Sequence, residues 1–246
     1  PLPESGWLPF AGPSLRRRPP ARGEIQRRTD GSAKRMTEAD TSPEYFYPNK
    51  LGRIVLMAIE EIVGHNGLNA LLNLANLQHL INNLPPNNYD LGFPYEDISA
   101  LHRALEEMYG PRGGRGLALR AGRACFKYGM REFGPSLGIS DLTFRLLPLH
   151  MKLKVGAEVF ARTFTRLTHQ VIRLEEEPDA YLWIIERCPI CWGRTSEVPC
   201  CHLAVGILQE SLFWVSGGKN FLVDEIACIA AGDPTCTIRV DRQPLD

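Results

Sequence analysis

The sequence lacks several features that would place it in a common class of protein. No run of about 18 apolar residues occurs in its 246 residues, so the sequence offers no candidate membrane span. Its N-terminus has no apolar segment of the kind that secretory signals carry. The run from Gly110 to Gly116 does not have the Gly-x-Gly-x-x-Gly spacing of a dinucleotide site, and no Ser/His/Asp set is evident. A cytoplasmic protein without a nucleotide or hydrolase site is therefore expected.

Charge is balanced overall but unevenly placed. Residues 1–35 carry a surplus of five positive charges, and the remainder carries the matching deficit. An acidic main domain argues against nucleic-acid binding as the principal function. Residues 1–40 are interpreted as a disordered, basic, Pro/Arg-rich leader, or as translated upstream sequence ahead of a start at Met36. A nucleic-acid-binding arm is the alternative, but no aromatic residue interleaves the arginines.

The pattern of apolar residues predicts an α+β domain that begins with helices and ends with a small antiparallel sheet. Residues 41–175 form its helical portion, and residues 176–243 hold its strands and a further packed helix. The expected helices are 51–63, 67–83, a helix from Asp97 to Gly110, 115–133, a long or broken helix over 141–170, and 202–216. The expected strands are 180–185, 221–228 and 235–240, the last two forming a hairpin. The Gly110–Gly116 run is expected to be a solvated loop.

Cysteine is the informative residue type. Six of the seven cysteines fall between Cys188 and Cys236, and only Cys125 stands apart. Because no secretory signal is visible, a reducing compartment is expected, where clustered cysteines bind metal more often than they form disulfides. The alternative is that these cysteines act as small buried hydrophobic residues.

The spacing favours a structural zinc site. Cys201 lies at the start of the expected helix 202–216, while Glu225, Cys228 and Cys236 lie on the hairpin. Glu225 and Cys228 have opposite parity along a strand, so a bulge or the strand's end must bring them together. Four protein ligands leave no position for water, which is typical of a structural and not a catalytic Zn²⁺ site. The neighbouring donors are alternatives, or a second site: Cys188, Cys191, Cys200 and His202.

The same residues resemble a known family. Cys201-His-Leu-Ala-Val-Gly206, followed by Glu225-x2-Cys228-x3-Gly232-Asp233-x2-Cys236, is similar to the 4-vinyl reductase domain over roughly residues 180–241. This domain occurs in a protein of bacteriochlorophyll biosynthesis, in hydrocarbon-binding proteins and in phenol-responsive transcription activators. The resemblance implies a fold related to Golgi-tethering subunits and haem-based nitric-oxide sensors, with an apolar pocket. It also implies zinc bound by Cys201 or Cys200 together with Glu225, Cys228 and Cys236.

Pocket residues are harder to predict. The phenol sensors hold their ligand with a His and a Trp upstream of the zinc ligands, and His150 and Trp183 occupy that region here. No local motif aligns them, so they are candidates only. The related haem sensors use a Tyr-x-Ser-x-Arg motif, which this sequence lacks.

The leading functional hypothesis is a zinc-stabilised sensor or carrier domain for a small hydrophobic or aromatic molecule, expected to be a homodimer. One alternative is a 4-vinyl reductase or pigment-carrier accessory protein of chlorophyll biosynthesis. Vinyl reduction needs a hydride or electron donor, and the sequence has no motif for one, so a role without catalysis is favoured. A second alternative, by analogy of fold alone, is an assembly or tethering subunit.

Overall fold

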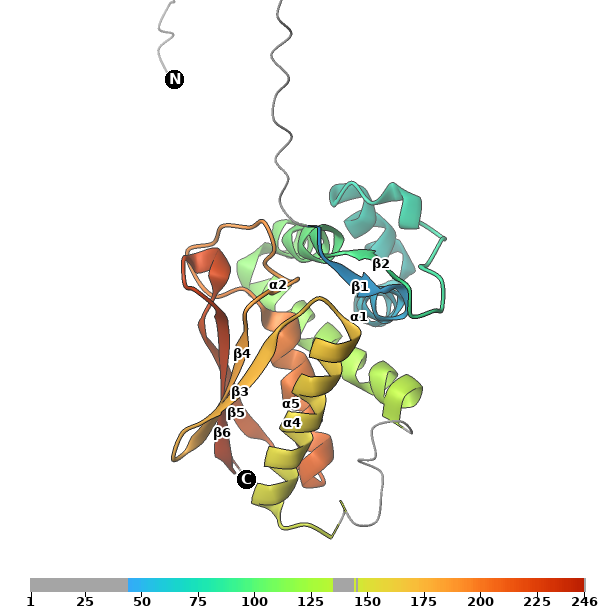
Figure 1. Ribbon diagram of the computed structural model, residues 1–246. Helices are drawn as coiled ribbons and strands as arrows, with labels where there is room; N and C mark the ends of the chain where they lie inside the picture. Colours follow the sequence, from blue (N-terminus) through green and yellow to red (C-terminus); the bar gives the residue numbers. More distant parts are fainter. Residues whose placement is uncertain (1–43, 135–143, 145, 246) are drawn as a thin grey trace, which may run out of the picture. The chain divides into compact units, whose positions relative to one another are not determined.

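The protein is described by a computed structural model that covers residues 44–134, 144 and 146–245. The predicted leader, residues 1–40, lies outside them. The elements follow one another as β1 (Phe46–Pro48), α1 (Asn49–Leu74), η1 (Gln78–Leu80), β2 (Leu91–Pro94), α2 (Tyr95–Phe133), α4 (Leu149–Leu167), β3 (Ile172–Glu176), β4 (Ala180–Ile185), α5 (His202–Ser216), β5 (Phe221–Ala227), η3 (Ile229–Ala231) and β6 (Cys236–Pro244) (Figure 1). The expected α+β class, with helices first and a small sheet afterwards, is confirmed. No helix in this part of the chain is both long and apolar enough to cross a membrane.

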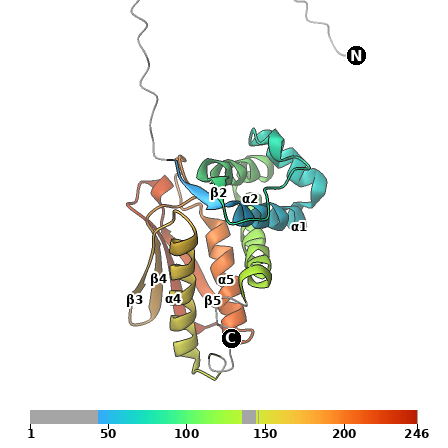
Figure 2. The same cartoon turned by 45° about the vertical axis from the view of Figure 1, so that its right-hand side comes forward.

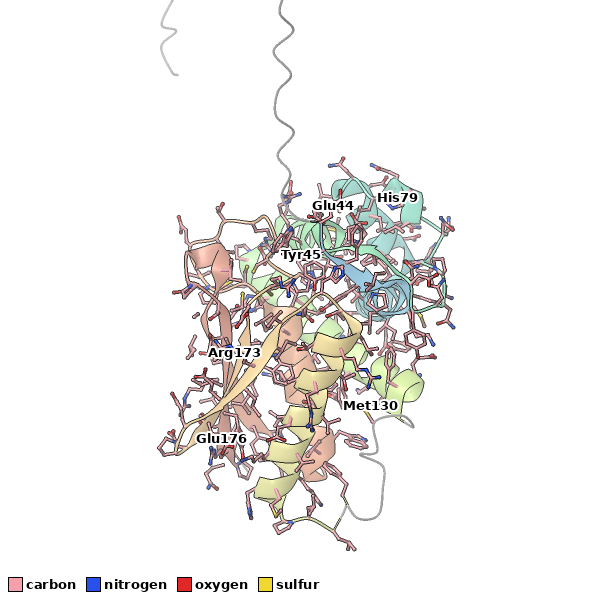
Figure 3. The ribbon with its side chains drawn as sticks, in the orientation of Figure 1. Glu44, Tyr45, His79, Met130, Arg173 and Glu176 are labelled. Carbon is pink, nitrogen blue, oxygen red and sulfur yellow. The ribbon has the colours of Figure 1, made fainter. Side chains whose placement is uncertain are left out.

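Four strands form an antiparallel sheet in the order β3-β4-β6-β5. The predicted hairpin of β5 and β6 and the predicted strand β4 are confirmed. Strand β3 was not expected, because its sequence Ile-Arg-Leu-Glu-Glu is largely charged. It is one of the two edge strands of the sheet, and charged side chains there discourage pairing with another chain. Arg173 and Glu176, labelled in Figure 3, form ion pairs with Glu186 and with Lys154. Helices α4 and α5 run along one face of the sheet (Figures 1 and 2).

Two glycines set the course of the long helices. Gly64 in α1 and Gly110 in α2 have φ values of 77° and 71°, so each element consists of two helical segments joined at a kink. Only glycine adopts this backbone region without strain. The predicted helix ends at Gly64 and Gly110 are therefore confirmed as breaks in the helical conformation.

Two sequence-based predictions of secondary structure were wrong. The second predicted helix, 67–83, ends at Leu74 and gives way to the short η1 turn, because Asn76 and Asn82 adopt positive φ. The Gly110–Gly116 run is not a loop but begins a helical segment that continues to Phe133. Pro111 occupies the first position of this segment, where its missing N–H leaves no hydrogen bond unmade. Of the long or broken helix expected over 141–170, α4 covers Leu149–Leu167, begins after Pro148 and continues through Gly156, while residues 141–143 and 145 lie outside the described residues.

Helices α2 and α5 cross in direct backbone contact. A Cβ atom built on Gly122 would lie 2.2 Å from the Leu203 carbonyl oxygen, and one on Gly206 would lie 2.2 Å from the Leu119 carbonyl oxygen. Any side chain at either position would force the two helices apart. The glycines of this crossing thus set the position of α5, whose N-cap residue is Cys201.

Candidate metal centre and apolar cavity

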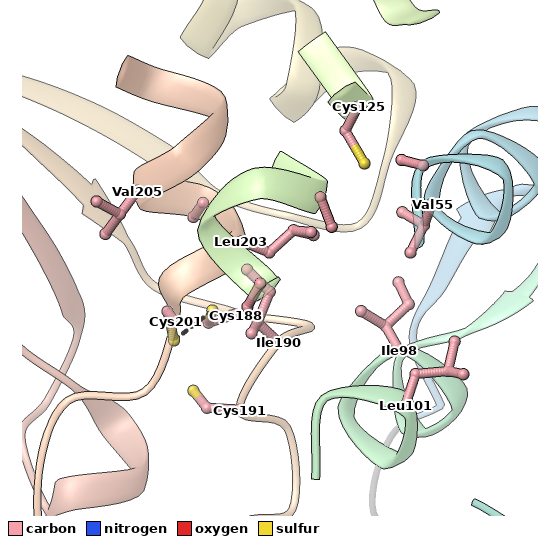
Figure 4. Close-up of a cluster of buried hydrophobic side chains, with 14 of the residues drawn as sticks. Val55, Ile98, Leu101, Cys125, Cys188, Ile190, Cys191, Cys201, Leu203 and Val205 are labelled. Carbon is pink, nitrogen blue, oxygen red and sulfur yellow. Dashed lines mark hydrogen bonds between the residues drawn. The ribbon is translucent and has the colours of Figure 1, made fainter. Parts of the chain in front are cut away.

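The loop between β4 and α5 and the two ends of the hairpin bring the cysteines together. Cys236 begins β6 and pairs with Ile185 at the end of β4, so Cys188 and Cys191, which follow β4, arrive beside it. Cys201 is the N-cap residue of α5, and Cys228 follows the end of β5. These five residues (Cys188, Cys191, Cys201, Cys228 and Cys236) are called the thiol cluster below (Figure 4 shows three of them). All are buried free thiols.

The sulfur atoms of the thiol cluster lie at the spacing that a tetrahedral zinc ion requires. Zn–S bonds of about 2.3 Å place the sulfurs of a tetrahedron roughly 3.8 Å apart. The Sγ–Sγ distance is 3.7 Å for Cys201–Cys236, 3.8 Å for Cys201–Cys228 and 3.9 Å for Cys228–Cys236. It is 3.5 Å for Cys188–Cys201 and 3.4 Å for Cys191–Cys236. The donor set therefore fits zinc both in chemistry and in spacing.

Two sets of four donors meet these spacings. One is the sequence-predicted set, Cys201, Glu225, Cys228 and Cys236, and the other is Cys188, Cys191, Cys201 and Cys236. Within each set the ligand atoms lie within 4.8 Å of one another. The structure thus brings together the four residues that the hairpin spacing indicated and also the Cys188-x2-Cys191 pair. Among the described residues, Cys200 and His202 belong to neither set, although the Cys200 Sγ lies 3.9 Å from that of Cys228.

A register shift in the hairpin brings the Glu225 side chain to the thiol cluster. The register of β5 against β6 shifts between Glu225 and Ala227, as the parity of Glu225 and Cys228 required. One carboxylate oxygen, Oε2, accepts a hydrogen bond of 2.7 Å from the Cys201 backbone N–H. The other, Oε1, is buried and has no hydrogen-bond partner among the described residues. An unpaired buried carboxylate oxygen is costly unless a cation or a proton satisfies it.

Burial and hydrogen bonding shift the pKa values of the donor groups in the cluster. Burial, and then the charge of Cys228, raise the pKa of Glu225 to about 8. Hydrogen bonds from Cys191 and Cys200 hold the pKa of Cys228 well below its usual range. The Ile229 backbone N–H donates to the Cys236 sulfur at 3.3 Å. A bound cation would stabilise the ionised forms of this carboxyl group and these thiols.

An apolar cavity of about 100 Å³ lies next to the thiol cluster. Helices α1, α2, α4 and α5 and strands β1, β3 and β4 line it. The side chains that line it are mostly aliphatic or aromatic, among them Ile54, Val55, Phe126, Met130, Phe133, Phe160, Phe164, Trp183, Leu203, Ala204, Ile207 and Leu208. Met130, from the last part of α2, is labelled in Figure 3. Ile190, between Cys188 and Cys191, also lines the cavity, as does Cys125 (Figure 4).

Polar groups are few in this wall. Among the described residues that line the cavity, Tyr47, Thr163, Gln170 and Trp183 carry oxygen or nitrogen in their side chains. The Tyr47 hydroxyl donates a hydrogen bond of 2.7 Å to Gln170 Oε1, and both residues are buried. Sequence reasoning missed this pair, because 123 positions separate the two residues and neither belongs to a motif.

The two pocket residues considered from the sequence lie in different places. Trp183 on β4 is buried and lines the cavity, in ring contact with Phe160 at 6.0 Å between centroids. His150 is exposed at the start of α4, and its carbonyl oxygen accepts a hydrogen bond from the Tyr181 hydroxyl. It is not among the described residues that line the cavity. A ligand-binding role for either residue stays a prediction.

Comparisons with known proteins establish the fold and no more. No family model matches the chain, and no curated protein matches its sequence. A Cs H-NOX mutant is 12% identical, with a TM-score of 0.52 over 80% of this chain and 98% of its own. The unliganded Fe(II) H-NOX protein from K. algicida is 10% identical, with a TM-score of 0.51 over 81% and 97%. The chain therefore shares the fold of these H-NOX proteins, which confirms the expected fold class.

The phenol-responsive sensory domain of the transcription activator PoxR also aligns, with 18% identity over 58% of this chain and 72% of its own. Its TM-score of 0.42 is too low to establish a shared fold. The resemblance to the 4-vinyl reductase domain thus stays a prediction that rests on the cysteine and glutamate spacing.

Proposed function

We propose that this protein is a binding domain for a small apolar molecule, and that zinc at the thiol cluster holds the wall of its binding site in place. The apolar cavity beside the cluster is the observation that carries the proposal. An engineered apolar cavity of about 150 Å³ binds benzene, so a cavity of about 100 Å³ suits a single aromatic ring or a smaller molecule. The shared H-NOX fold supports the proposal, because the fold places four helices around this space.

The chemistry of the wall suggests what the ligand carries. Its apolar side chains favour a hydrophobic body, and the Tyr47–Gln170 pair offers one polar contact. A phenol-like molecule satisfies both. A porphyrin or chlorin ring is far larger than the cavity, so a tetrapyrrole ligand, or a pigment-carrier role, requires the cavity to enlarge.

The metal would have a structural role, because it would fix the position of α5 relative to the hairpin. With Cys201, Glu225, Cys228 and Cys236 as ligands it ties the N-terminus of α5 to both strands of the hairpin. Residues Leu203, Ala204, Ile207 and Leu208 of the same helix line the cavity, so the position of α5 sets its shape. The positive end of the helix also favours the Cys201 thiolate.

Binding is tested by calorimetric titration of the purified protein with phenol and with benzene. The matched variants are Gly129→Leu and Gly116→Leu, both on α2. A Cβ at either position meets no atom within 4 Å, but only Gly129 lines the cavity. We expect Gly129→Leu to weaken binding at least tenfold and Gly116→Leu to leave it unchanged, with the zinc content equal in both. Failure of both probes to bind the wild-type protein contradicts the proposal.

The expected homodimer stays a prediction. Analytical ultracentrifugation of the same samples, with and without phenol, measures whether the chain associates and whether the ligand changes that association.

A further inference from the structure

The thiol cluster holds more donors than one zinc ion can use. A structural zinc ion takes four ligands. Five thiols and the Glu225 carboxylate converge here, and they do not form one group at ligand spacing. They divide instead into two complete sets of four, and both sets include Cys201 and Cys236. Two tetrahedra that share one edge have this arrangement, with two bridging ligands and two terminal ligands on each side.

A single zinc ion leaves unsatisfied groups in either set. If it takes Cys188, Cys191, Cys201 and Cys236, then Glu225 stays buried at 7% exposure with an unpaired oxygen atom. If it takes the set that contains Glu225, then Cys188 and Cys191 remain as thiols at 0% and 1% exposure, within 3.5 Å of the bound sulfurs of Cys201 and Cys236. Only two ions employ all six donors.

The charge of such a centre is reasonable for its surroundings. Five thiolates and one carboxylate with two Zn²⁺ ions have a formal charge of about −2. The Arg194 backbone N–H donates to the Cys191 carbonyl oxygen at 3.1 Å, which places this residue beside the cluster. Its guanidinium is largely buried at 7% exposure, and its Nη1 atom has no hydrogen-bond partner among the described residues. The same guanidinium forms an ion pair with Glu106, Nη2 to Oε2 at 2.5 Å, so its charge offsets only part of that of the centre.

We infer that the thiol cluster binds two zinc ions that share the thiolates of Cys201 and Cys236. Cys188 and Cys191 are the terminal ligands of one ion, and Glu225 and Cys228 are the terminal ligands of the other. This inference rests on the zinc part of the proposed function and is independent of the ligand in the cavity. Each ion has four protein ligands, so the centre is structural and joins the β4–α5 loop, the hairpin and α5.

The first test is native mass spectrometry of the untagged full chain, purified without added zinc. The wild-type protein is expected to carry two zinc ions. Cys191→Ser and Cys228→Ser each remove one terminal ligand from one ion only, so each variant is expected to carry one zinc ion. Cys125→Ser, at a buried cysteine outside both donor sets, is the matched control and is expected to carry two zinc ions.

The second test needs no variant. X-ray absorption at the zinc edge of the wild-type protein is expected to show Zn–S distances of about 2.3 Å and a zinc–zinc scattering path. Two zinc ions without that path overturn the shared thiolates. One zinc ion per wild-type chain overturns the inference and leaves the single-zinc site of the proposed function intact. A chain that binds no zinc overturns both, whereas loss of phenol binding alone bears only on the cavity.

Discussion

The thiol cluster and the apolar cavity are neighbours in the fold but differ in how the chain builds them. The cluster draws its donors from 49 consecutive positions, Cys188 to Cys236, and each donor is of a rare residue type. The cavity draws its wall from seven elements between Tyr47 and Leu208, in common residue types. Metal ligation is specific to a few atoms, whereas an apolar wall requires only shape and hydrophobicity. The two regions should therefore respond differently to substitution.

The largest expected effect is the loss of a shared metal ligand. Cys201→Ala removes a donor from both sets, and structural zinc contributes about 10 kcal/mol or more in small zinc domains. That equals or exceeds the stability of a typical domain, which is about 5–15 kcal/mol. We expect this variant to lose its cooperative thermal transition.

Cys125→Ala is the control for that variant, because it deletes an equally buried thiol from the cavity wall. Its expected cost is about 1 kcal/mol in the free energy of unfolding. Calorimetry of the two variants measures the contrast. Similar unfolding temperatures would show that the thiol cluster acts as ordinary apolar packing.

The second effect concerns the helix crossing that connects the two regions. Gly122→Ala places a Cβ 2.2 Å from a backbone oxygen of α5, so the helices must separate. We expect a loss of about 3 kcal/mol in the free energy of unfolding. Gly116→Ala, on the same helix in open space, should gain up to about 1 kcal/mol from helix propensity. Chemical denaturation measures both, and an unchanged midpoint for Gly122→Ala would contradict the close crossing.

The third prediction separates the acid sensitivity of the helical core from that of the metal centre. Burial lowers the pKa of His102 to about 4, although its Nδ1–H donates to the Ile98 carbonyl oxygen. The unfolded chain therefore binds the proton more readily, with a pKa near 6.5. This contribution to stability is complete above about pH 6.5 and is lost as the pH falls toward 4.

At pH 5 the expected loss from His102 is about 2 kcal/mol. Comparison of wild-type protein with His102→Asn between pH 7 and pH 5 isolates this loss, since zinc release affects both proteins alike. Equal pH dependence in the two proteins would assign the acid sensitivity to the metal centre alone.

The smallest expected effect lies at the polar contact in the cavity. Tyr47→Phe removes the hydroxyl that donates to Gln170 and should cost about 1 kcal/mol of stability. It should also weaken the binding of phenol more than that of benzene, while the zinc content stays the same. Titration with both probes checks this, and an equal loss for the two would place the ligand elsewhere in the cavity.

The difference between the thiol cluster and the apolar cavity also explains which features the sequence could predict. Hydrophobic patterning correctly predicted β4, α5 and the hairpin, and the parity of Glu225 and Cys228 correctly required a bulge. It could not predict β3, whose charged residues belong to an edge strand, or the helix from Pro111 through a glycine-rich run. Nor could spacing alone show that Cys188 and Cys191 lie close to Cys201 and Cys236, because that depends on the pairing of β4 with β6.

Helix α5 begins at the thiol cluster and continues along the cavity, and Ile190 lies between two of the thiols while lining the same cavity. This arrangement has a thermodynamic consequence. If a molecule in the cavity prefers the metal-bound position of α5, then the bound molecule raises the affinity of the protein for zinc. By reciprocity, bound zinc raises the affinity of the protein for that molecule by the same factor. Chelators and thiol oxidants would then displace the ligand without touching the cavity, and a saturating ligand would slow the release of the metal.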